Sequence, residues 1–221
     1  MSAERRLSRT KDIPTKIKNP DLVNRRRRQI ADAAAQLFID NGFHKTTTRQ
    51  IARKAGVSIG SLYEYIVSKE DVLYLVCESI YFEVERSVAK TMEKAGIGGD
   101  ALSEVIRAYF LVCHRMSDLI LLIYQETRSL PPQWRKKVQE NELRITGIFV
   151  EMLTRLATEG VLPNLDESTI ELTAHNISVL GHMWSFRRWY LAQHYRIEDY
   201  ITQQTEFILG LLNKNRPELK I

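Results

Sequence analysis

The side chains with the clearest chemical use in this sequence are hydroxyls and cations gathered between residues 25 and 69. Hydroxyl groups donate hydrogen bonds to phosphate oxygens, and arginine or lysine neutralises phosphate charge, so this mixture favours contact with a nucleic-acid backbone. We predict DNA contacts for Arg25, Arg26, Arg27, Arg28, Thr48, Ser58, Ile59, Gly60, Ser61, Tyr63, Tyr65 and Lys69.

The stretch TTTRQIARKAGVSIGSLYEYI at residues 46–66 predicts two short helices that carry most of these side chains. Apolar residues recur at helical spacing in two runs, and Gly56 permits a tight turn between them. Thr47 or Thr48 can cap the first helix, and Ser58 can cap the second. Two short helices joined by a glycine-containing turn, with a helix before them to pack against, form a helix-turn-helix unit.

The second short helix has one apolar face and one free face. The small core of the unit is predicted to contain Ile51, Ala55, Val57, Leu62 and Ile66. A helix that enters the major groove needs small residues where its backbone approaches DNA, and Gly60 and Ser61 meet that need. The hydroxyls of Thr48, Tyr63 and Tyr65 can donate to phosphates and fix the docking register. In the alternative interpretation, the two tyrosines cover the core and Gly60 is a packing contact.

The charge of the chain is divided unequally along its length. Residues 1–70 contain 15 Lys and Arg against 7 Asp and Glu, net +8, and the rest contains 17 against 20, net −3. Lys69 adds a cation at a helix start, where free backbone N–H groups already favour an anion. A basic head on a slightly acidic body indicates that only the head meets a polyanion.

Four consecutive arginines, Arg25 to Arg28, precede the first apolar-periodic position of the head. Cations at a helix start oppose the helix dipole, so a solvated charge run without a partner is the weaker interpretation. We predict phosphate contacts for some of the four. An N-terminal arm can reach a minor groove with further cations, which are Arg5, Arg6, Arg9, Lys11, Lys16 and Lys18.

The whole chain is predicted to be all-α, with an N-terminal three-helix DNA-binding domain and a larger C-terminal helical domain. Residues 1–23 are predicted to be a flexible basic arm, residues 24–70 the helix-turn-helix domain and residues 71–221 the helical body. Ser68 and Asp71 have the form of a capping box that opens a long helix. The predicted helices from there on span residues 69–94, 100–115, 118–128, 132–159, 166–194 and 197–214.

The composition argues against an enzyme, a metalloprotein and a membrane protein. Cys77 and Cys113 are the only cysteines, without metal-knuckle spacing, and we expect two buried free thiols. No phosphate-cradling glycine loop, HExxH pair or nucleophile–base arrangement is found. The longest apolar run, residues 119–124, is far shorter than the ~20 residues that span a bilayer, and no signal peptide is recognised. We expect a cytoplasmic protein with no catalytic residue, metal ion, cofactor or membrane partner.

The segment IADAAAQLFIDNGFHKTTTRQIARKAGVSIGSLYEYIVSKEDVL, residues 30–73, resembles the N-terminal domain of TetR-type transcriptional regulators, the tetracycline-repressor family. The resemblance rests on the threonines before the second helix, Ile-Ala-x-x-Ala-Gly-Val-Ser, Gly-x-Leu-Tyr and Ser-Lys-Glu. One departure is Tyr65-Ile66, where many relatives carry His or Tyr followed by Phe. This change is conservative for the core, and it leaves open which phosphate or base is touched.

The resemblance implies how single residues read an operator. By that resemblance, Thr48, Tyr63 and Lys69 would hold phosphates. Arg49 would reach a guanine edge, and Ile59 would contact a thymine methyl group. The resemblance also implies a sequence-specific regulator of transcription, a repressor, whose operator binding is released by a small, largely apolar effector.

The last two helices predict a homodimer. Ile197, Ile201, Thr205, Ile208 and Leu212 make one stripe along the final helix. Such a stripe can pack inside the monomer, but terminal helices of this length in TetR-like chains pair with their copies in a four-helix bundle. A two-fold dimer would read a palindromic operator in double-stranded DNA, with half-sites about 34–36 Å apart or a small multiple of that.

Large side chains in the middle of the body are expected to be mostly core, and some would line an effector cavity as in the family. In the stretch HMWSFRRWY at residues 182–190, Arg187 and Arg188 beside three aromatics would fit an anion such as a fatty acyl-CoA or a carboxylate. They fit equally well as partners of acidic residues across the dimer. The predicted pocket lining is His114, Tyr124, Gln125, Phe149, Asn176, Trp184 and Arg187.

Two other function classes are open at this point. A protein that binds DNA without an effector, in an architectural role, would have a solid body without a cavity. An enzyme is disfavoured by its missing motifs, although a catalytic group assembled only in space is invisible in one sequence. DNA binding repeated with candidate metabolites separates all three classes.

Overall fold

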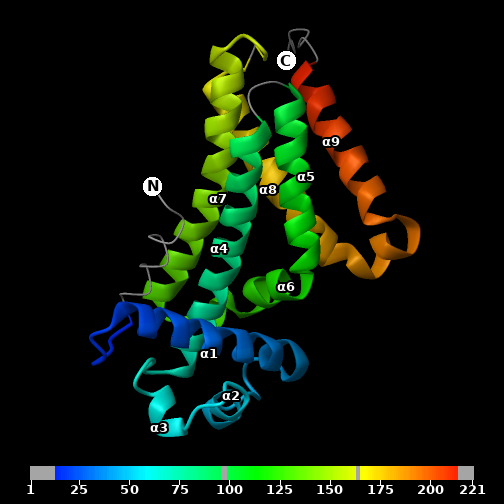
Figure 1. Ribbon diagram of the computed structural model, residues 1–221. Helices are drawn as coiled ribbons and strands as arrows, with labels where there is room; N and C mark the ends of the chain where they lie inside the picture. Colours follow the sequence, from blue (N-terminus) through cyan, green and yellow to red (C-terminus); the bar gives the residue numbers. More distant parts are fainter. Residues whose placement is uncertain (1–12, 96–98, 163–164, 214–221) are drawn as a thin grey trace. The chain divides into compact units, whose positions relative to one another are not determined.

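The computed structural model describes residues 13–95, 99–162 and 165–213, and all regular structure within these ranges is helical (Figure 1). The predicted all-α fold is confirmed. The helices are α1 (Pro20–Asn41), α2 (Thr48–Lys54), α3 (Ile59–Leu62), α4 (Lys69–Ala95), α5 (Gly99–Arg115), α6 (Ser117–Glu126), the 3-10 turn η2 (Thr127–Ser129), α7 (Pro132–Thr158), α8 (Glu167–His194) and α9 (Ile197–Asn213).

Helix α1 begins before the arginine run, at Pro20, so the predicted arm is wrong for residues 20–23. The side chain of Asn19 caps the helix by accepting from the backbone N–H groups of Asp21 and Leu22. Proline is favoured in the first turn because its ring sets a helical φ and its missing N–H would have no partner there. Asn19-Pro20 therefore starts a helix at a point where the sequence was interpreted as irregular.

The two short helices have the predicted caps. Thr47 and Gln50 form a capping box at the start of α2, and the Ser58 hydroxyl accepts from the Ser61 N–H at the start of α3. Gly56 between them has φ +66°, a conformation that side chains with a Cβ rarely adopt. Helix α3 is a single turn that ends at Leu62, and Ile66, which was predicted for the small core, is buried after the end of the helix.

Helix α4 opens with the predicted capping box. The Asp71 carboxylate accepts from the N–H groups of Val67 and Ser68, and the Ser68 hydroxyl accepts from the N–H of Asp71. The other carboxylate oxygen of Asp71 accepts from the indole N–H of Trp134 at 2.8 Å, and Trp134 stacks on Tyr74 with ring centroids 4.3 Å apart. The start of α7 is thereby fixed to the start of α4.

The chain divides into two compact units, and α4 and α7 contribute to both. The first unit contains residues 1–83 and 118–141, and the second contains residues 84–117 and 142–221. The core of the first unit joins the helix-turn-helix to the beginnings of α4 and α7. Its most buried side chains include Phe38, Ile51, Leu62, Ile66 and Leu73.

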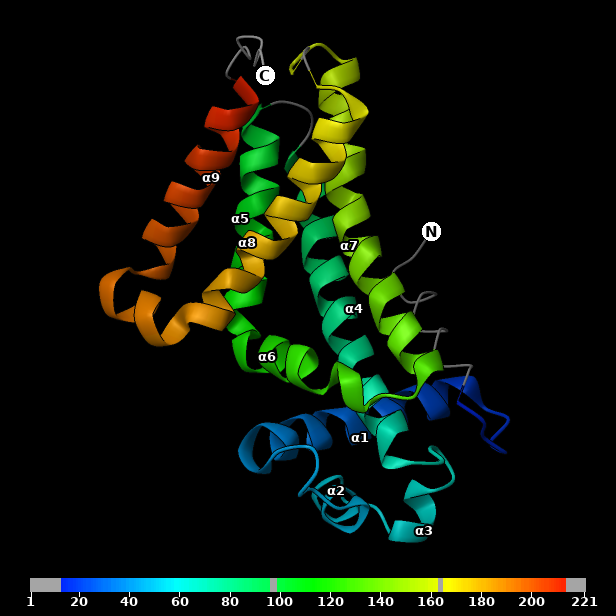
Figure 2. The ribbon, with the colours of Figure 1, turned by 180° about the vertical axis from the view of Figure 1, so that it is seen from behind.

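The second unit is built around α5, which packs against α8 and α9 (Figure 2). Helix α8 approaches α5 closely at Gly181, because a Cβ at that position would collide with the ring of Tyr109. Cys113 on α5 is a buried free thiol, as is Cys77 in the first unit, which confirms that prediction. Burial raises the pKa of both thiols to about 12, so neither forms a reactive thiolate near neutral pH.

No helix in the described part of the chain has both the length and the apolar character that a membrane span requires.

Candidate nucleic-acid interface

The hydroxyls of Thr48 and Tyr63 meet at the surface of the helix-turn-helix, 3.1 Å apart. Thr48 is the first residue of α2, and Tyr63 follows the last residue of α3 with 49% of its surface exposed. The turn at Gly56 brings these two helix ends together. One of the two hydroxyls donates to the other, so the pair has one O–H left to donate to a phosphate oxygen beside a helix N-terminus, which is the geometry of a backbone-positioning contact.

Gly60, on the exposed surface of α3, is not in close packing contact with other parts of the first unit. A Cβ built at Gly60 would meet only the Ser58 hydroxyl oxygen, at 3.9 Å, and Gly60 does not have a positive φ. Neither packing nor backbone conformation within the chain therefore requires glycine there, which argues against the alternative interpretation of a packing contact. Ile59 is 40% exposed beside it, and Arg49 is exposed on α2. This surface is available to a partner that approaches closely.

Two predicted DNA contacts are buried and are corrected. Tyr65 is 5% exposed, and Arg27 is 2% exposed. The Arg27 guanidinium donates from Nε to the Tyr65 carbonyl at 3.0 Å and from Nη2 to the Ile13 carbonyl at 2.7 Å. Burial lowers the pKa of Arg27, and the nearby carboxylates of Asp71 and Glu78 oppose that shift. Arg27 therefore links internal backbone groups and does not meet a phosphate.

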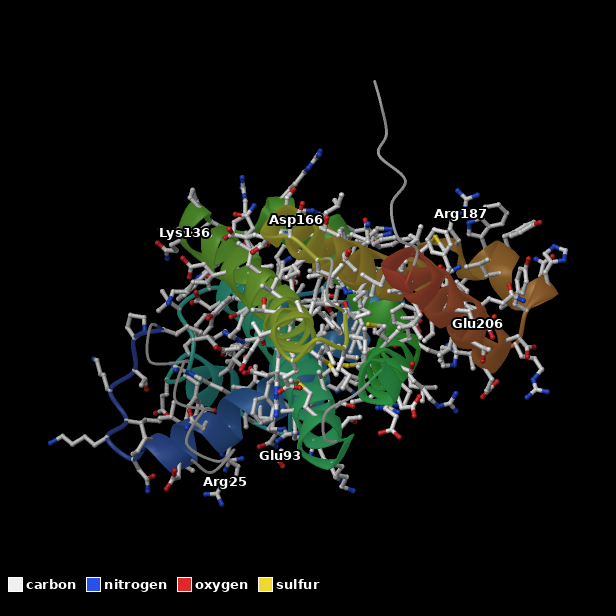
Figure 3. The ribbon with its side chains drawn as sticks, turned by 90° about the horizontal axis from the view of Figure 1, so that it is seen from above. Arg25, Glu93, Lys136, Asp166, Arg187 and Glu206 are labelled. Carbon is white, nitrogen blue, oxygen red and sulfur yellow. The ribbon has the colours of Figure 1, made fainter. Side chains whose placement is uncertain are left out.

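Helical periodicity explains why the arginine run does not act as one cluster. Val23, Arg27, Ile30 and Ala34 follow one another at i+4, i+3 and i+4, and all four are buried. Arg25 and Arg28 fall on the exposed side of α1, where Figure 3 shows Arg25 directed outward, and Arg26 donates to the Gln29 amide oxygen. Arg25, Arg26 and Arg28 thus remain candidate phosphate contacts.

Lys69 has a different position from the one predicted. Its ammonium donates to the carbonyls of Phe43, His44 and Thr46 at 2.8, 3.2 and 3.0 Å, and it lies 4.4 Å from the centroid of the Phe43 ring. These three bonds use every N–H of the ammonium group, so a phosphate would have to displace one of them. In this geometry Lys69 supports the loop before α2 and thereby positions Thr48.

The residues predicted to line an effector pocket are divided between the two units. Tyr124 and Gln125 are exposed on α6 in the first unit, and Asn176 and Arg187 are exposed on α8 in the second. Figure 3 shows Arg187 directed away from the helices of its unit. The remaining three are in the interior or at its edge: His114 and Trp184 have ring centroids 5.6 Å apart, and Phe149 packs on Tyr109 at 5.1 Å.

Buried polar atoms of the second unit add residues that sequence reasoning missed. His114 Nδ1, Trp184 Nε1, Ser185 Oγ and Thr205 Oγ1 are buried without a hydrogen-bond partner. These four side chains belong to α5, α8 and α9, which pack together. Burial, and next the charge of Arg188, lowers the pKa of His114, which favours its neutral form. Thr205 stood in the predicted apolar stripe of the last helix, where a hydroxyl is the signal that could have identified it.

A second buried polar cluster in the same unit is fully paired. The Tyr109 hydroxyl lies 3.0 Å from His182 Nε2 and 3.1 Å from the Ser178 carbonyl, to which it donates. Burial lowers the pKa of His182 to about 4, so its ring is neutral near pH 7. Neither Tyr109 nor His182 was assigned a polar role from the sequence, because the contact joins α5 to α8 across 73 residues.

Helix α8 carries a second apolar face that no helix in the described part of the chain covers. Leu172, Val179 and Tyr190 are 62%, 55% and 46% exposed, and their spacing places them within about 20° of each other around the helix. Asn176 and Arg187 lie on the same side by that spacing. On α9, Phe207 and Leu211 are also exposed. Large apolar residues gathered on one face of adjacent helices are typical of a protein–protein interface.

Comparison with known proteins links both units to one group of regulators. Residues 30–74 match the family model described as bacterial regulatory proteins, tetR family, and residues 98–212 match the tetracyclin repressor-like C-terminal domain. The chain is 26% identical over 197 residues to the HTH-type transcriptional regulator HbdR of Aromatoleum sp. (strain CIB), covering 89% of this chain and 85% of that protein.

Two similar proteins have names that refer to fatty acids or their derivatives. The chain is 31% identical over 134 residues to the fatty acid metabolism regulator protein of Bacillus subtilis (strain 168), covering 60% of this chain and 66% of that protein. The solved structure of the regulator FadR from Bacillus subtilis in complex with stearoyl-CoA aligns with a TM-score of 0.66 and 25% identity, covering 86% of this chain and 99% of that chain.

Proposed function

Because the chain belongs to the TetR family of DNA-binding transcriptional regulators, a non-enzymatic family, we propose that it is a homodimeric repressor released by an acyl-CoA or a similar amphipathic anion. The observation that carries the DNA-binding part is the Thr48–Tyr63 hydroxyl pair beside the uncovered face of α3. The hydroxyl pair would hold a phosphate, while Arg49 and Ile59 reach base edges in the major groove. The protein would act in the cytoplasm, on a palindromic operator.

The proposed dimer rests on the uncovered apolar face of α8 and α9. Such a face is costly to leave in water, and a second copy of the chain offers the same face for a self-complementary two-fold contact. Two copies also present two recognition helices to the two halves of a palindrome. Asn176 and Arg187 would then lie in or beside this contact instead of in an effector pocket.

The proposed effector rests on four buried polar atoms without a hydrogen-bond partner, on the packed helices α5, α8 and α9. An isolated buried donor or acceptor costs about 1–3 kcal/mol, so a ligand with polar groups that pairs with these atoms would recover that free energy. The likeness to a FadR that binds stearoyl-CoA supports an acyl-CoA in particular. To release the operator, the effector must bind the state of the dimer that does not fit the operator more tightly than the state that does.

A DNA mobility-shift titration with acyl-CoAs tests this proposal. The probe is a duplex that the full-length chain selects from a randomised pool, and a scrambled duplex of the same composition is the control. We expect saturable binding to the selected duplex, which a long-chain acyl-CoA reverses and the free fatty acid or coenzyme A alone reverses less. Selective DNA binding that none of these compounds changes would favour the alternative, a DNA-binding protein without an effector.

A further inference from the structure

We propose that the segment before α1 is docked against the recognition unit, and that its exposed lysines grip duplex DNA outside the base pairs that face α3. This inference rests on the proposed operator binding, and it assigns the DNA contact to residues 13–19, which the helix-turn-helix itself does not include. The buried Arg27 holds this segment in place through its hydrogen bond to the Ile13 carbonyl.

Two hydrogen bonds and the burial of Ile13 attach this segment to the helix-turn-helix. Ile13 is buried, at 1% exposure, and its carbonyl accepts from Arg27 Nη2 at 2.7 Å. The same guanidinium donates from Nε to the carbonyl of Tyr65. The Thr15 hydroxyl donates to the carbonyl of Glu64 at 2.8 Å. Arg27 and Thr15 therefore tie the segment to consecutive residues of the connection between α3 and α4.

The path of the backbone agrees with these bonds. Figures 1 and 2 both show the dark-blue segment beside the connection between α3 and α4. Thr15 Oγ1 also accepts from the N–H of Ile17, and Asn19 caps α1, so the segment is held at both ends and in its middle. A tethered segment loses less conformational entropy on binding than a free arm, and its cations therefore contribute more to affinity.

The segment is attached at a residue next to the proposed phosphate site in the sequence. Glu64 directly follows Tyr63, whose hydroxyl is paired with Thr48 at the proposed phosphate site. Lys16 and Lys18 are exposed and follow Thr15 within three residues, which is at most about 10 Å along an extended chain. Both lysines are thus exposed and close in the chain to the residue that bonds Glu64, the neighbour of Tyr63 in the sequence.

The charge of this surface is nearly all of one sign. Residues 13–28 contain Lys16, Lys18 and four arginines, of which Arg27 is buried, against Asp21 as the sole acidic residue. Lys16, Lys18, Arg25 and Arg28 are exposed. A concentrated positive surface beside a recognition helix is the electrostatic footprint of duplex DNA, which bears a negative charge about every 1.7 Å of its axis.

The test compares two double variants of equal charge change. Lys16→Ala/Lys18→Ala removes the proposed contacts, and Lys90→Ala/Lys94→Ala removes two exposed lysines of α4. Both are titrated by fluorescence anisotropy with the selected duplex at several salt concentrations. The duplex is used trimmed to its core and extended by about one helical turn, roughly ten base pairs, on each side. Circular dichroism and thermal melting establish that each variant is folded.

We expect the Lys16/Lys18 variant to lose up to about 1.8 from the slope of log affinity against log salt for each chain bound, since a phosphate contact contributes ~0.9. It should also lose the preference of the wild type for the extended duplex while it keeps the preference for the selected core over a scrambled one. The Lys90/Lys94 variant should match the wild type in all three quantities. An unchanged slope and an unchanged flank preference in the Lys16/Lys18 variant would overturn the inference.

This outcome is distinguishable from a failure of the proposed function. A wild-type chain that does not prefer any selected core over scrambled DNA would contradict operator binding itself. A chain with normal core selectivity and no contribution from Lys16 and Lys18 would contradict the docked segment alone. Thr15→Val adds a finer test, because it keeps both lysines but removes the bond to Glu64, and we expect it to reduce the flank preference partially.

Discussion

Tyr63 and Tyr65 are separated by one residue in the sequence, but their surroundings in the structure are different. Tyr63 is half exposed, and its hydroxyl is 3.1 Å from that of Thr48, whereas Tyr65 is buried, and its backbone carbonyl is held by Arg27. Side chains two residues apart on a turn of this kind point in different directions. A single type of residue therefore has an interface role at one position and a core role at the other.

Removing one hydroxyl at each tyrosine separates these roles. Tyr63→Phe deletes the group proposed to donate to a phosphate, and we expect a three- to thirtyfold loss of operator affinity, about 0.7–2 kcal/mol, with unchanged stability. Tyr65→Phe keeps the buried ring and its backbone contacts, so affinity should match the wild type. The two variants are compared by mobility shift and urea denaturation. Equal operator affinities of the Tyr63→Phe and Tyr65→Phe variants would contradict a phosphate contact by the Tyr63 hydroxyl.

Gly60 gives a second prediction at the scale of one residue. Because only the Ser58 hydroxyl lies within 4 Å of a Cβ built there, Gly60→Ala should leave stability unchanged or raise it by up to about 1 kcal/mol. The added methyl group would keep the backbone of α3 from approaching DNA, and we expect at least a tenfold weaker affinity. Gly147→Ala, at an exposed helical glycine of α7, is the matched control and should affect stability alone. Undiminished affinity in Gly60→Ala would contradict close approach at this point.

At the scale of the elements, single charged side chains position the loops and helix ends of the first unit. The ammonium group of Lys69, at the start of α4, donates its three N–H groups to three carbonyls of the loop before α2. No N–H of the group is left for another partner. Asp71 similarly holds the N-terminus of α4 and the indole of Trp134 at once. The helix-turn-helix is thus fixed to the longer helices by charged hydrogen bonds as well as by its small aliphatic core.

Replacing the lysine tests its structural role. Lys69→Met removes three charge-assisted bonds from a partly buried site, and we expect a loss of about 1–3 kcal/mol in the free energy of unfolding. Lys45→Met, at an exposed lysine of the same loop, should change stability by less than about 0.5 kcal/mol. Chemical denaturation measures both. A phosphate contact without a structural role would leave Lys69→Met as stable as the control.

The contact between α5 and α8 has a predictable dependence on pH. His182 beside Tyr109 has its pKa lowered to about 4, against an ordinary value of ~6.5. Below about pH 6.5 the unfolded chain binds a proton that the folded chain does not, so stability falls as pH drops from ~6.5 to ~4 and changes little above that range. The part due to His182 amounts to roughly 3 kcal/mol.

Urea denaturation at about pH 7.5 and about pH 4.5 measures the contribution of His182 to the pH dependence of stability. We expect His182→Asn to lose much less stability between the two pH values than the wild type. His175→Asn, at an exposed histidine of α8, should behave like the wild type. The same pH dependence in His182→Asn and the wild type would show that the neutral imidazole is not a determinant of stability.

The long helices could be predicted from the sequence, and the contacts between them could not. Helices such as α7 and α9 have periodic apolar positions and clear breaks at both ends, and their bounds agree with the prediction within one residue. Arg27 was misassigned because four identical residues were treated as one surface, although its spacing from Val23 and Ile30 places it on the buried side. The pairing of Tyr109 with His182, and the unpartnered hydroxyls of Ser185 and Thr205, depend on which helices meet, and local spacing carries no such information.

At the scale of the whole molecule, function in this account depends on two copies of the chain. The uncovered face of α8 and α9 in the second unit would join them, and the first unit of each copy would read one half-site. An effector bound in the second unit would change DNA affinity only if it binds the two states of the dimer with different affinity.

One charge placed in the proposed contact tests the dimer. Val179 is 55% exposed in the middle of the apolar face of α8, and Val179→Glu would bury two like charges near the two-fold axis. We expect sedimentation to show a monomer at micromolar concentration, together with a loss of operator affinity of at least tenfold. Leu143→Glu, at an exposed apolar residue of α7, should remain dimeric. A Val179→Glu protein that stays dimeric would place the contact elsewhere.

The most direct test of the whole account asks whether the exposed face of α3 reads bases. Duplexes are selected from a randomised pool in parallel by the wild type and by Ile59→Gln, a substitution at an exposed position that leaves the core intact. Glutamine pairs with adenine, whereas isoleucine contacts a thymine methyl group, so we expect altered base preference at one position of each half-site and unchanged preference at the others. Identical selected sequences, bound with identical affinity by both proteins, would contradict base reading by this face.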